Sequence, residues 1–399
     1  MDAIQKARAF SSQIRHRDSA QRVDDKQMTP RVFQPPISGA AYYGQAYKYE
    51  EVTHYRGWVA ACIGASIREV AGSEAPHIGR VYKREIDGDG KLKRKSWRPV
   101  RKALGGPKQH EEFEPYEDDH PIVQVFRRPN SHYVAYDLWA YHMLFKGLTG
   151  EAHWWVIRNQ FRAPVEIWVI PTHWMRLETD GWGRPVAYAV QSPWGQLQHV
   201  PYEDVVSFRD HSPLNMYEGA ALLQIGAEWI DSYEAQVRAR LAMFKNGGAP
   251  AFHVLLGESY ADPDEAFLAR FYAKWMQRFQ GENNWGKPVV TGPDVEVKQL
   301  GVTPDEIPFQ AGEEMGRDEI CALYGTPKGV LGIEPSTDVS AYAPQRQYVR
   351  FRINPELKYI GEVVTEKIVR QTPDHEDGVF FFDDHVINDP EQQRADINT

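Results

Sequence analysis

This chain of 399 residues has only two cysteines, Cys62 and Cys321, which lie far apart in the sequence and have no Cys or His partner at metal-ligand spacing. That pattern argues against a disulfide or zinc framework and favours a reducing compartment, with both thiols buried. No apolar run approaches the roughly 18 residues that span a bilayer, and the first residues lack an apolar secretory segment. We therefore expect a soluble, intracellular protein with no membrane partner.

Motifs of common enzymes are also missing. The chain has no Walker A phosphate loop, so it is not an ATP-driven motor, and no Gly-x-Ser-x-Gly elbow. Asp210-His211-Ser212 has the residue types of a catalytic triad, but three consecutive residues cannot form the hydrogen-bonded relay. Asp87–Gly90 loosely matches a calcium loop but lacks most of the ligand positions, and we interpret it as a hairpin turn. We expect no catalytic residue and no cofactor.

One cluster of carboxylates and imidazoles could serve a divalent metal, at Asp374–Asp377 and Asp383–His385. A strand predicted at 379–382 separates the two halves and sends alternate side chains to opposite faces, and the run continues into an acidic segment. The favoured interpretation is therefore a solvated acidic surface without metal. A metal-dependent nuclease or hydrolase that uses residues 374–385 stays as the alternative.

The composition indicates a folded protein of two or three domains. Hydrophobic residues make up 42% of the chain, enough for a sizeable core. The net charge of −9 disfavours a protein whose whole surface grips nucleic acid. It is compatible with a protein that lets DNA slide past.

The first third of the chain mixes an irregular arm with helical and strand patterns. Residues 1–51 show little periodicity and are expected to form an N-terminal arm, followed by a helix at 52–71. A hairpin is predicted at 78–97. Eleven Lys/Arg lie within 80–108, whereas 111–119 is acidic, and these blocks could pair with each other. We interpret this part as a solvated surface insertion.

The middle of the chain predicts an α+β region followed by a long helix and a small unit. A helix is expected at 136–147, and antiparallel strands at 152–158, 165–170, 185–191 and 205–208. Apolar residues at spacings of three and four predict a helix from 218 to 245, ended by Asn246-Gly-Gly248. Residues 250–303 should then form a compact unit with strands at 252–256, 288–291 and 295–300 and a helix at 264–279.

The most informative passage is a helix stop followed by a polar loop and a second helix. Met315, Ile320, Leu323 and Tyr324 fit one helical face, and Gly325 with Pro327 beyond it ends a helix. Residues 333–344 are expected to be a loop, and the next helix to begin at Gln345. No nucleophile or phosphate cradle accompanies this loop, which indicates a mechanical part.

Seven short stretches in this order resemble the phage portal proteins of long-tailed bacteriophages over roughly residues 52–399. They are Trp58–Ile63, His120-Pro121 with Arg127–Asn130, Leu148-Thr-Gly-Glu-Ala152, Phe244–Pro250, Gly286–Val290 with Val302–Asp305, Gly325–Gly332, and Gln345-Arg-x-Tyr-x-Arg350. Gly325–Gly332 departs from the family's usual Gly-Val-Pro-Pro-His-Leu-Leu-Gly pattern and places a cation and an extra glycine beside the loop.

The resemblance implies a portal fold that assembles into a ring, by analogy of twelve copies, at one capsid vertex. The implied wing is at 52–217, with its long helix at 345–371, and the two stem helices are at 218–249 and 304–326. The implied clip is at 250–303 and the tunnel loop at 327–344. A small or truncated crown would follow at 372–399. The role of the insertion at 85–119 is not carried over. The implied location is the virion, reached from the host cytoplasm during assembly.

The resemblance also implies the partners and the site residues. The partners would be other copies of the chain, the terminase large subunit, the head–tail adaptor, the major capsid protein and double-stranded DNA in the channel. The tunnel-loop residues would be Lys328, Glu334, Ser336, Thr337, Asp338, Val339 and Ser340. The clip helix would present Arg270, Lys274 and Arg278 to terminase or adaptor, and Trp229 and Tyr233 would serve oligomerisation. A structural connector without a DNA-lining loop is a further alternative.

Overall fold

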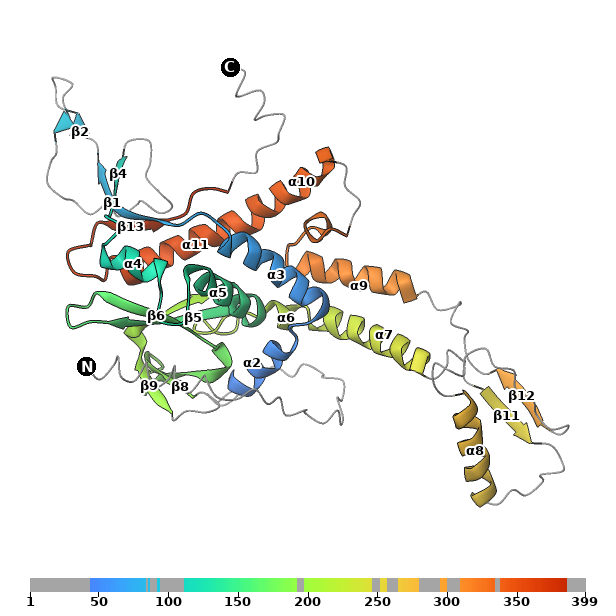
Figure 1. The fold of residues 1–399 in the computed structure, drawn as a ribbon. Helices are drawn as coiled ribbons and strands as arrows, with labels where there is room; N and C mark the ends of the chain where they lie inside the picture. Colours follow the sequence, from blue (N-terminus) through green and yellow to red (C-terminus); the bar gives the residue numbers. More distant parts are fainter. Residues whose placement is uncertain are drawn as a thin grey trace. The chain divides into compact units, whose positions relative to one another are not determined.

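A computed structural model describes residues 44–83, 85–86, 92–93, 111–191, 197–245, 252–256, 265–279, 295–299, 309–333 and 338–385 (Figure 1). The chain divides into two units: one holds Met1–Ile225 together with Cys321–Thr399, and the other holds Gly226–Ile320. The second unit is thus an insertion in the first. The expected arm at 1–43 and the strand expected at 288–291 lie outside the described residues.

A three-stranded antiparallel sheet in the order β10-β5-β6 is the centre of the first unit. Its strands are β5 (Glu151–Arg158), β6 (Pro164–Ile170) and β10 (Val205–Arg209), close to the predicted bounds. Because side chains alternate along a strand, Trp154 and Val156 enter the main core, whereas Trp155 packs on a second cluster. Both faces of this sheet are therefore covered.

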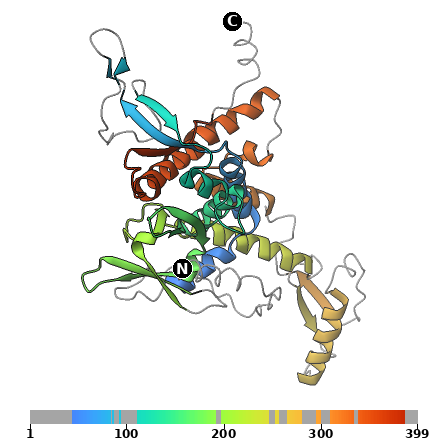
Figure 2. The same ribbon diagram turned by 60° about the vertical axis from the view of Figure 1, so that its left-hand side comes forward.

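Helices cover one face of this sheet and build the main core. They include α3 (Gly57–Ala71), α4 (Pro121–Arg127) and α5 (Ala135–Thr149). Leu138, Trp139 and Met143 of α5 pack with the strands and with Phe380 from the far end of the sequence. Lys146 of α5 forms an ion pair with Glu356 of the C-terminal helical segment, so the two come close together; Figure 2 shows that segment in orange and red. Among the described helices, none is both long and apolar enough to cross a membrane.

A second antiparallel sheet covers the opposite face. It has the order β7-β8-β9 and comprises β7 (Met175–Thr179), β8 (Pro185–Val190) and β9 (Gln198–Pro201). The sequence predicted β8 but neither β7 nor β9. Short 3-10 turns at Thr172–Trp174 and Tyr202–Asp204 lead into the strands β7 and β10.

A third sheet joins two distant parts of the sequence. Strand β1 (His77–Lys83) pairs on one side with β4 (Glu111–Pro115) and on the other with β13 (Gly378–Phe381). In β1 and β4, Lys83 faces Glu111 and Arg80 faces Glu114. The register places basic residues of β1 opposite acidic residues of β4, while the Arg80 side chain pairs with Asp377. Charge pairing between the two blocks stays a prediction. The hairpin expected over 78–97 is confirmed only in part. The short strands β2 (Glu85–Ile86) and β3 (Leu92–Lys93) pair as predicted, but residues 78–83 belong to β1 and pair with β4 and β13.

Two predicted helices begin at the wrong place. The helix expected at 52–71 is two helices, α2 (Gly44–Thr53) and α3, separated at Gly57, whose φ of 55° is left-handed and breaks the helical path. The helix expected from 218 instead comprises α6 (Leu222–Ile225) and α7 (Ala227–Lys245). Residue Gly219 is held outside the helix because its main chain lies against the Gly150 carbonyl.

The long C-terminal helix also begins earlier than predicted. Helix α10 (Asp338–Tyr348) continues through a π-helical turn at Val349–Ile353 into α11 (Asn354–Val364) and a second π-helical turn at Thr365–Val369. The sequence prediction placed the start at Gln345, after Pro344, because proline usually ends a helix. In the structure Pro344 lies inside α10.

The second unit consists of a helix pair and a small β-α-β module. Helix α7 runs antiparallel to α9 (Phe309–Leu323), since Tyr233 packs on Gly316 and Gln236 on Gly312. Arg240 and Glu313 add an ion pair of 2.6 Å. Strands β11 (Phe252–Leu256) and β12 (Val295–Gln299) pair antiparallel, and α8 (Glu265–Phe279) lies between them in the sequence.

Candidate functional site

The predicted helix stop at the end of α9 is confirmed. Helix α9 ends at Leu323, and Gly325 has a left-handed φ of 61°. The amide of Thr326 donates to the Cys321 carbonyl at 2.9 Å, which closes the end of the helix before Pro327. On the predicted apolar face Ile320 and Tyr324 are buried, but Met315 is 64% exposed.

A 3-10 turn, Lys328–Leu331, follows the helix stop, and the two glycines near it have different roles. Gly332 has a left-handed φ of 69°, which a residue with a side chain rarely adopts. Gly329, by contrast, is not among the glycines with a left-handed φ. A Cβ on Gly329 would lie 2.8 Å from the Pro344 ring, and glycine is needed there for close packing.

The predicted tunnel loop is shorter than residues 333–344. Asp338, Val339 and Ser340 belong to α10, so their placement in a loop is wrong; the sequence signal failed because Pro344 was taken as a helix boundary. Lys328 lies in the 3-10 turn before the loop. Glu334, Ser336 and Thr337 lie outside the described residues. The candidate loop thus centres on 334–337, between Ile333 and Asp338.

Buried tyrosines hold the two sides of this connection. Tyr324 donates from its hydroxyl to the Gly147 carbonyl at 3.2 Å, and the Tyr348 hydroxyl lies 2.8 Å from Ser66 Oγ. Burial raises the pKa of both phenols. Cys62 and Cys321 are both buried free thiols, as the sequence predicted, and contact with Cys321 together with burial raises the pKa of Cys62. The connection is therefore fixed to α3 and α5.

A buried lysine joins α5, β10 and α11. Lys146 Nζ lies 2.7 Å from Asp210 Oδ1 and 2.8 Å from Glu356 Oε1, and only 3% of the lysine side chain is exposed. The ammonium also lies 5.3 Å from the centre of the Tyr359 ring. Burial by itself lowers the pKa of Lys146, but Glu356 and Asp210 more than offset burial and the pKa is raised. Removing the lysine would leave Glu356 buried without its cation.

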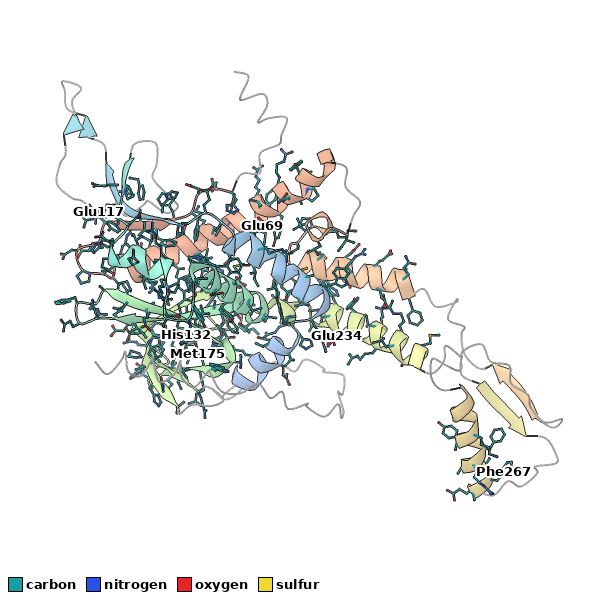
Figure 3. The ribbon with its side chains drawn as sticks, viewed as in Figure 1. Glu69, Glu117, His132, Met175, Glu234 and Phe267 are labelled. Atoms are coloured by element: carbon teal, nitrogen blue, oxygen red, sulfur yellow. The ribbon has the colours of Figure 1, made fainter. Side chains whose placement is uncertain are left out.

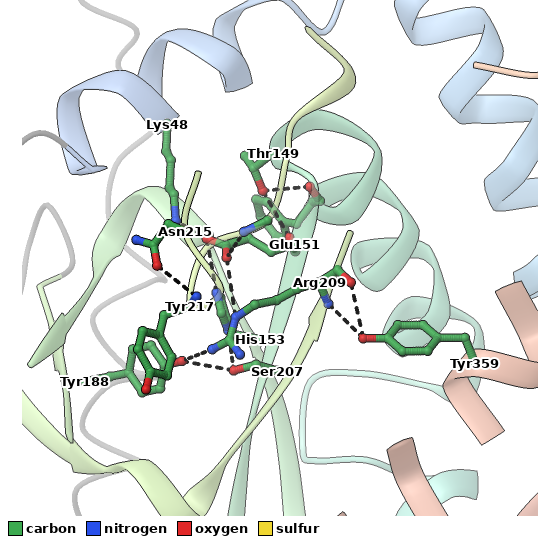
Figure 4. A network of polar contacts seen from close by, with 12 residues as sticks. Lys48, Thr149, Glu151, His153, Tyr188, Ser207, Arg209, Asn215, Tyr217 and Tyr359 are labelled. Carbon is green, nitrogen blue, oxygen red and sulfur yellow. Dashed lines mark hydrogen bonds and ion pairs between the residues drawn. The ribbon is translucent and has the colours of Figure 1, made fainter. Parts of the chain in front are cut away.

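A second buried cluster surrounds Glu151 at the start of β5 (Figure 4). The Glu151 carboxylate pairs with Lys48 of α2, accepts a hydrogen bond from the Gly219 amide at 3.1 Å and lies 3.8 Å from Arg209 Nε. Burial lowers the pKa of Lys48, and burial with the nearby cations Arg209 and Lys48 holds the pKa of His153 well below its usual value. Glu151 thereby connects α2 to the segment before α6.

Hydrogen bonds extend this cluster to the second sheet and to α11. His153 Nδ1 lies 2.8 Å from Ser207 Oγ, which lies 3.1 Å from the Tyr188 hydroxyl. The Tyr188 hydroxyl accepts from Arg209, and the Tyr359 hydroxyl accepts from the Arg209 amide at 3.1 Å. The Lys146 and Glu151 clusters hold the two ends of segment 210–219 in place.

The raised pKa of the buried Glu51 predicts that the free energy of unfolding depends on pH. Burial raises its pKa from about 4.5 to about 8, although Lys48 and the hydrogen bond from Gln224 lower it. Between pH 4.5 and pH 8 the folded chain holds a proton on Glu51 that the unfolded chain has lost. The contribution of this proton to the free energy of unfolding is therefore fully present below pH 4.5 and is lost as the pH rises towards 8. We expect a loss of about 3 kcal/mol between pH 5 and pH 8.

The measurement is the urea midpoint as a function of pH. Glu51→Gln should flatten the curve across this range, because a glutamine carries no proton to lose. Glu50→Gln is the control on the same helix. Glu50 makes the smallest contribution to the raised pKa of Glu51, so this variant should keep most of the slope. An unchanged slope in Glu51→Gln would assign the pH dependence to another group.

The structure separates the acidic and histidine cluster of 374–385. His375 Nε2 lies 2.8 Å from His120 Nε2, Asp377 lies 3.7 Å from Arg80, and Asp383 pairs with His77 at 2.7 Å. Strand β13 lies between the two halves. Within the part of the chain that the structure describes, no group of three or more His, Cys, Asp or Glu side chains could hold a metal ion. This geometry disfavours the nuclease alternative.

The remaining predicted residues lie in the second unit. Trp229 on α7 is 43% exposed, whereas Tyr233 is half-buried because it packs on Gly316 of the same chain. Arg270 and Lys274 are exposed on α8, the helix that carries Phe267 in Figure 3. The side chain of Arg278 lies outside the described residues. The exposed side chains Leu268 and Tyr272 give α8 a mixed basic and apolar surface.

Sequence reasoning missed both buried charge clusters. Lys146 had a usable signal, since it stands in the apolar run Met143–Leu148 of a helix with little polar surface. A charge at such a position must find a partner. Lys48 and Arg209 gave no such signal, because their partners come from distant parts of the sequence.

Solved structures show the same fold. A subunit of the neck of an empty gene transfer agent (GTA) particle has a TM-score of 0.56 and 14% identity, over 90% of this chain and 95% of that chain. An HK97-family phage portal protein from Corynebacterium diphtheriae has a TM-score of 0.54 and 13% identity, over 84% and 94%. The fold is that of portal and neck subunits.

Comparison of the amino-acid sequence with known families shows which family the chain belongs to. The model of the phage portal protein family matches residues 109–395, more than half of the chain, and the chain belongs to this family. Uncharacterized proteins of Rickettsia felis and Rickettsia bellii are each 22% identical, over 53% and 54% of this chain. The chain spans about 56% of the length of these curated relatives. The predicted family is thereby confirmed, and the predicted α+β portal fold agrees with these solved structures.

Proposed function

We propose that this portal protein forms a closed ring of twelve copies at one capsid vertex and that DNA enters and leaves the capsid through its channel. The observation that carries the proposal is the inserted second unit, in which the antiparallel pair α7 and α9 ends in the module β11-α8-β12. We assign the helix pair to the stem, the module to the clip, and the first unit to the wing. Matches to subunits of virion necks support this assignment.

Ring assembly is tested by native mass spectrometry of the purified chain. The expected species has about twelve times the mass of the 45.8 kDa subunit. A head-to-tail ring buries two different surfaces of each copy, which accounts for apolar side chains that are exposed on one chain. A monomer or dimer at micromolar concentration would contradict the proposal and favour a different activity.

Trp229→Glu should disrupt this ring. We propose that the exposed indole on α7 lies between neighbouring stems, where a buried carboxylate without a cation costs several kcal/mol. Smaller species should then dominate the native mass spectrum. Trp229→Phe keeps an apolar ring at the same position and should preserve assembly. Intact rings in Trp229→Glu would place this residue outside the contact.

The clip helix α8 is the proposed docking surface for the terminase large subunit and later for the head–tail adaptor. Arg270 and Lys274 are exposed, and rim charges of this kind set the encounter rate with a partner more than they stabilise a ring. Replacing Arg270, Lys274 and Arg278 together by Glu should weaken terminase binding roughly tenfold while rings persist. The charge-preserving Arg270→Lys, Lys274→Arg and Arg278→Lys is the control. If the Glu variant binds terminase as tightly as the natural chain does, the docking surface is not on this face of α8.

The connection between α9 and α10 is the proposed contact with DNA in the channel. Strong contacts from Lys or Arg to phosphate would oppose each step of a sliding duplex, whereas the segment 334–337 offers Glu, Pro, Ser and Thr. A net charge of −9 would keep DNA away from the wall. We further propose contact with the major capsid protein, assembly in the host cytoplasm, and no enzymatic role. A connector without a DNA-lining loop is the competing assignment.

A further inference from the structure

Two histidines outside the proposed channel meet at one wall of a pocket. His120 stands at the N-terminus of α4 and His375 in the turn that leads to β13, and their Nε2 atoms lie 2.8 Å apart. The Tyr116 ring stacks on His120 at a centroid distance of 4.3 Å and meets His375 edge-on at 5.2 Å. Both imidazoles line a pocket of about 500 Å³ with Phe161 and Asp374.

Neighbouring atoms fix the protons of this pair. His120 Nδ1 accepts a hydrogen bond from the Ile122 amide at 3.2 Å, so this nitrogen carries no proton and Nε2 carries one. His375 Nδ1 lies 2.6 Å from the Pro373 carbonyl, which can only accept, so Nδ1 carries the proton. His120 Nε2–H therefore donates to His375 Nε2. Two neutral rings satisfy all four nitrogens.

A further proton breaks this arrangement wherever it binds. A proton on His375 Nε2 would place two N–H groups face to face at 2.8 Å. A proton on His120 Nδ1 would face the Ile122 N–H and remove the cap of α4. Each singly protonated state thus loses one of the two hydrogen bonds, either the bond between the rings or the cap of α4. When both rings are protonated, all four nitrogens carry protons and no hydrogen bond can join His120 to His375.

Some of the groups around the pair lower the pKa of His120 and others raise it. Burial, His375 and Arg80 lower the pKa of His120, and Asp119 raises it. Arg80 of β1 donates to the Asp374 carbonyl at 3.0 Å and lies 3.7 Å from Asp377. The other ionisable groups around the pair are Tyr116 at the end of β4, Glu376 in the turn and Arg162 at the tip between β5 and β6.

We propose that the His120–His375 pair is a proton-sensitive latch, which holds the turn 372–377 against α4 while at least one ring is neutral and releases the turn when both rings are protonated. The turn is already under strain, since Asp374 has a left-handed φ of 65°. It connects the end of the long helix to β13, so release loosens the wall of the pocket and the entry into the third sheet. This proposal does not depend on ring assembly.

The experiment measures amide hydrogen exchange of residues 372–378 by mass spectrometry, normalised to the intrinsic exchange rate at each pH. Because the pKa of His120 lies below its usual value of 6.5, protection is complete above that pH and lost as pH falls through the lower folded value. Between about pH 7.5 and about pH 4.5 we expect roughly a tenfold loss of protection in the natural chain. A loss below twofold in the natural chain would by itself overturn the proposal.

Substitutions of the two histidines test whether His120 and His375 cause the pH-dependent loss of protection. His120→Gln with His375→Gln retains an amide donor and acceptor but cannot titrate, and its protection should change less than about twofold over the same range. His132→Gln removes an exposed histidine of the same unit and should behave like the natural chain. A pH response in the double variant equal to that of the natural chain would overturn the latch. The single variant His375→Gln serves the same comparison if the double variant fails to fold.

Discussion

Lys146→Met lowers the free energy of unfolding by about 3–5 kcal/mol, because the variant leaves Glu356 buried without its cation. Glu356 is 6% exposed, and its neighbour Arg352 lies 3.5 Å from the carboxylate, too far to replace the hydrogen bond that the lysine donates to Oε2. The urea midpoint of the purified chain measures the effect. This is the largest expected effect of a single substitution in the first unit.

A second variant separates lost charge pairing from lost packing. Lys146→Met combined with Glu356→Leu removes both charges, and a buried ion pair replaced by apolar groups is often neutral. The double variant should recover more than half of the lost stability, while Asp210, 32% exposed at its side chain, stays solvated. A double variant as unstable as the single one would show that the methylenes of Lys146, and not its charge, hold α5 to α11.

If the proposed ring and channel form, shortening the connection between α9 and α10 should reduce the length or the retention of packaged DNA and leave the ring assembled. Deleting 335–341 removes the proposed channel segment, and the contacts that hold Tyr324 and Tyr348 lie outside the deletion. Since α10 begins at Asp338, this deletion also removes the first four residues of that helix. Deleting 334–337 spares α10 and isolates the loop.

Genome length per capsid is the measurement for both deletions. Full-length and stably retained genomes in both would remove the tunnel role and support a connector without a DNA-lining loop. Loss of the ring in the 334–337 deletion would show that the segment is packed between subunits. A defect only with 335–341 would assign the effect to the start of α10. Single changes at Ser336 or Val339 should be mild, because the proposed requirement is a mobile backbone.

Local patterns predicted the strands of the central sheet and the stop at Gly325 well. Alternating apolar residues in 152–158 and a glycine followed by proline each act over a few neighbouring positions, and the same forces operate in the folded chain. The boundaries at Gly44, Leu222 and Asp338 were missed. Contacts between distant segments accompany two of these elements: Lys48 of α2 pairs with Glu151, and Gly219, before α6, lies against Gly150.

The candidate site was predictable in position but not in detail. The helix stop located the connection between α9 and α10, whereas the role of Gly329 is visible only when Pro344 packs on it. The buried clusters around Lys146 and Glu151 join five elements and leave almost no trace in the sequence. The assignment of the loop, the clip helix and Trp229 to DNA, terminase and ring contacts is still a set of predictions.

The pairing of β1 with β13 sets an order for folding during synthesis. His77 pairs with Phe381 and Arg80 with Gly378, so the third sheet needs two segments roughly 300 residues apart. At about 5–20 residues per second, a ribosome takes roughly 15–60 s between them. The inserted second unit is complete in sequence before β13 emerges, and it can fold while one edge of β1 is still open. An unpaired strand edge of this kind invites aggregation. The nascent chain is therefore expected to depend on chaperones until β13 closes that edge.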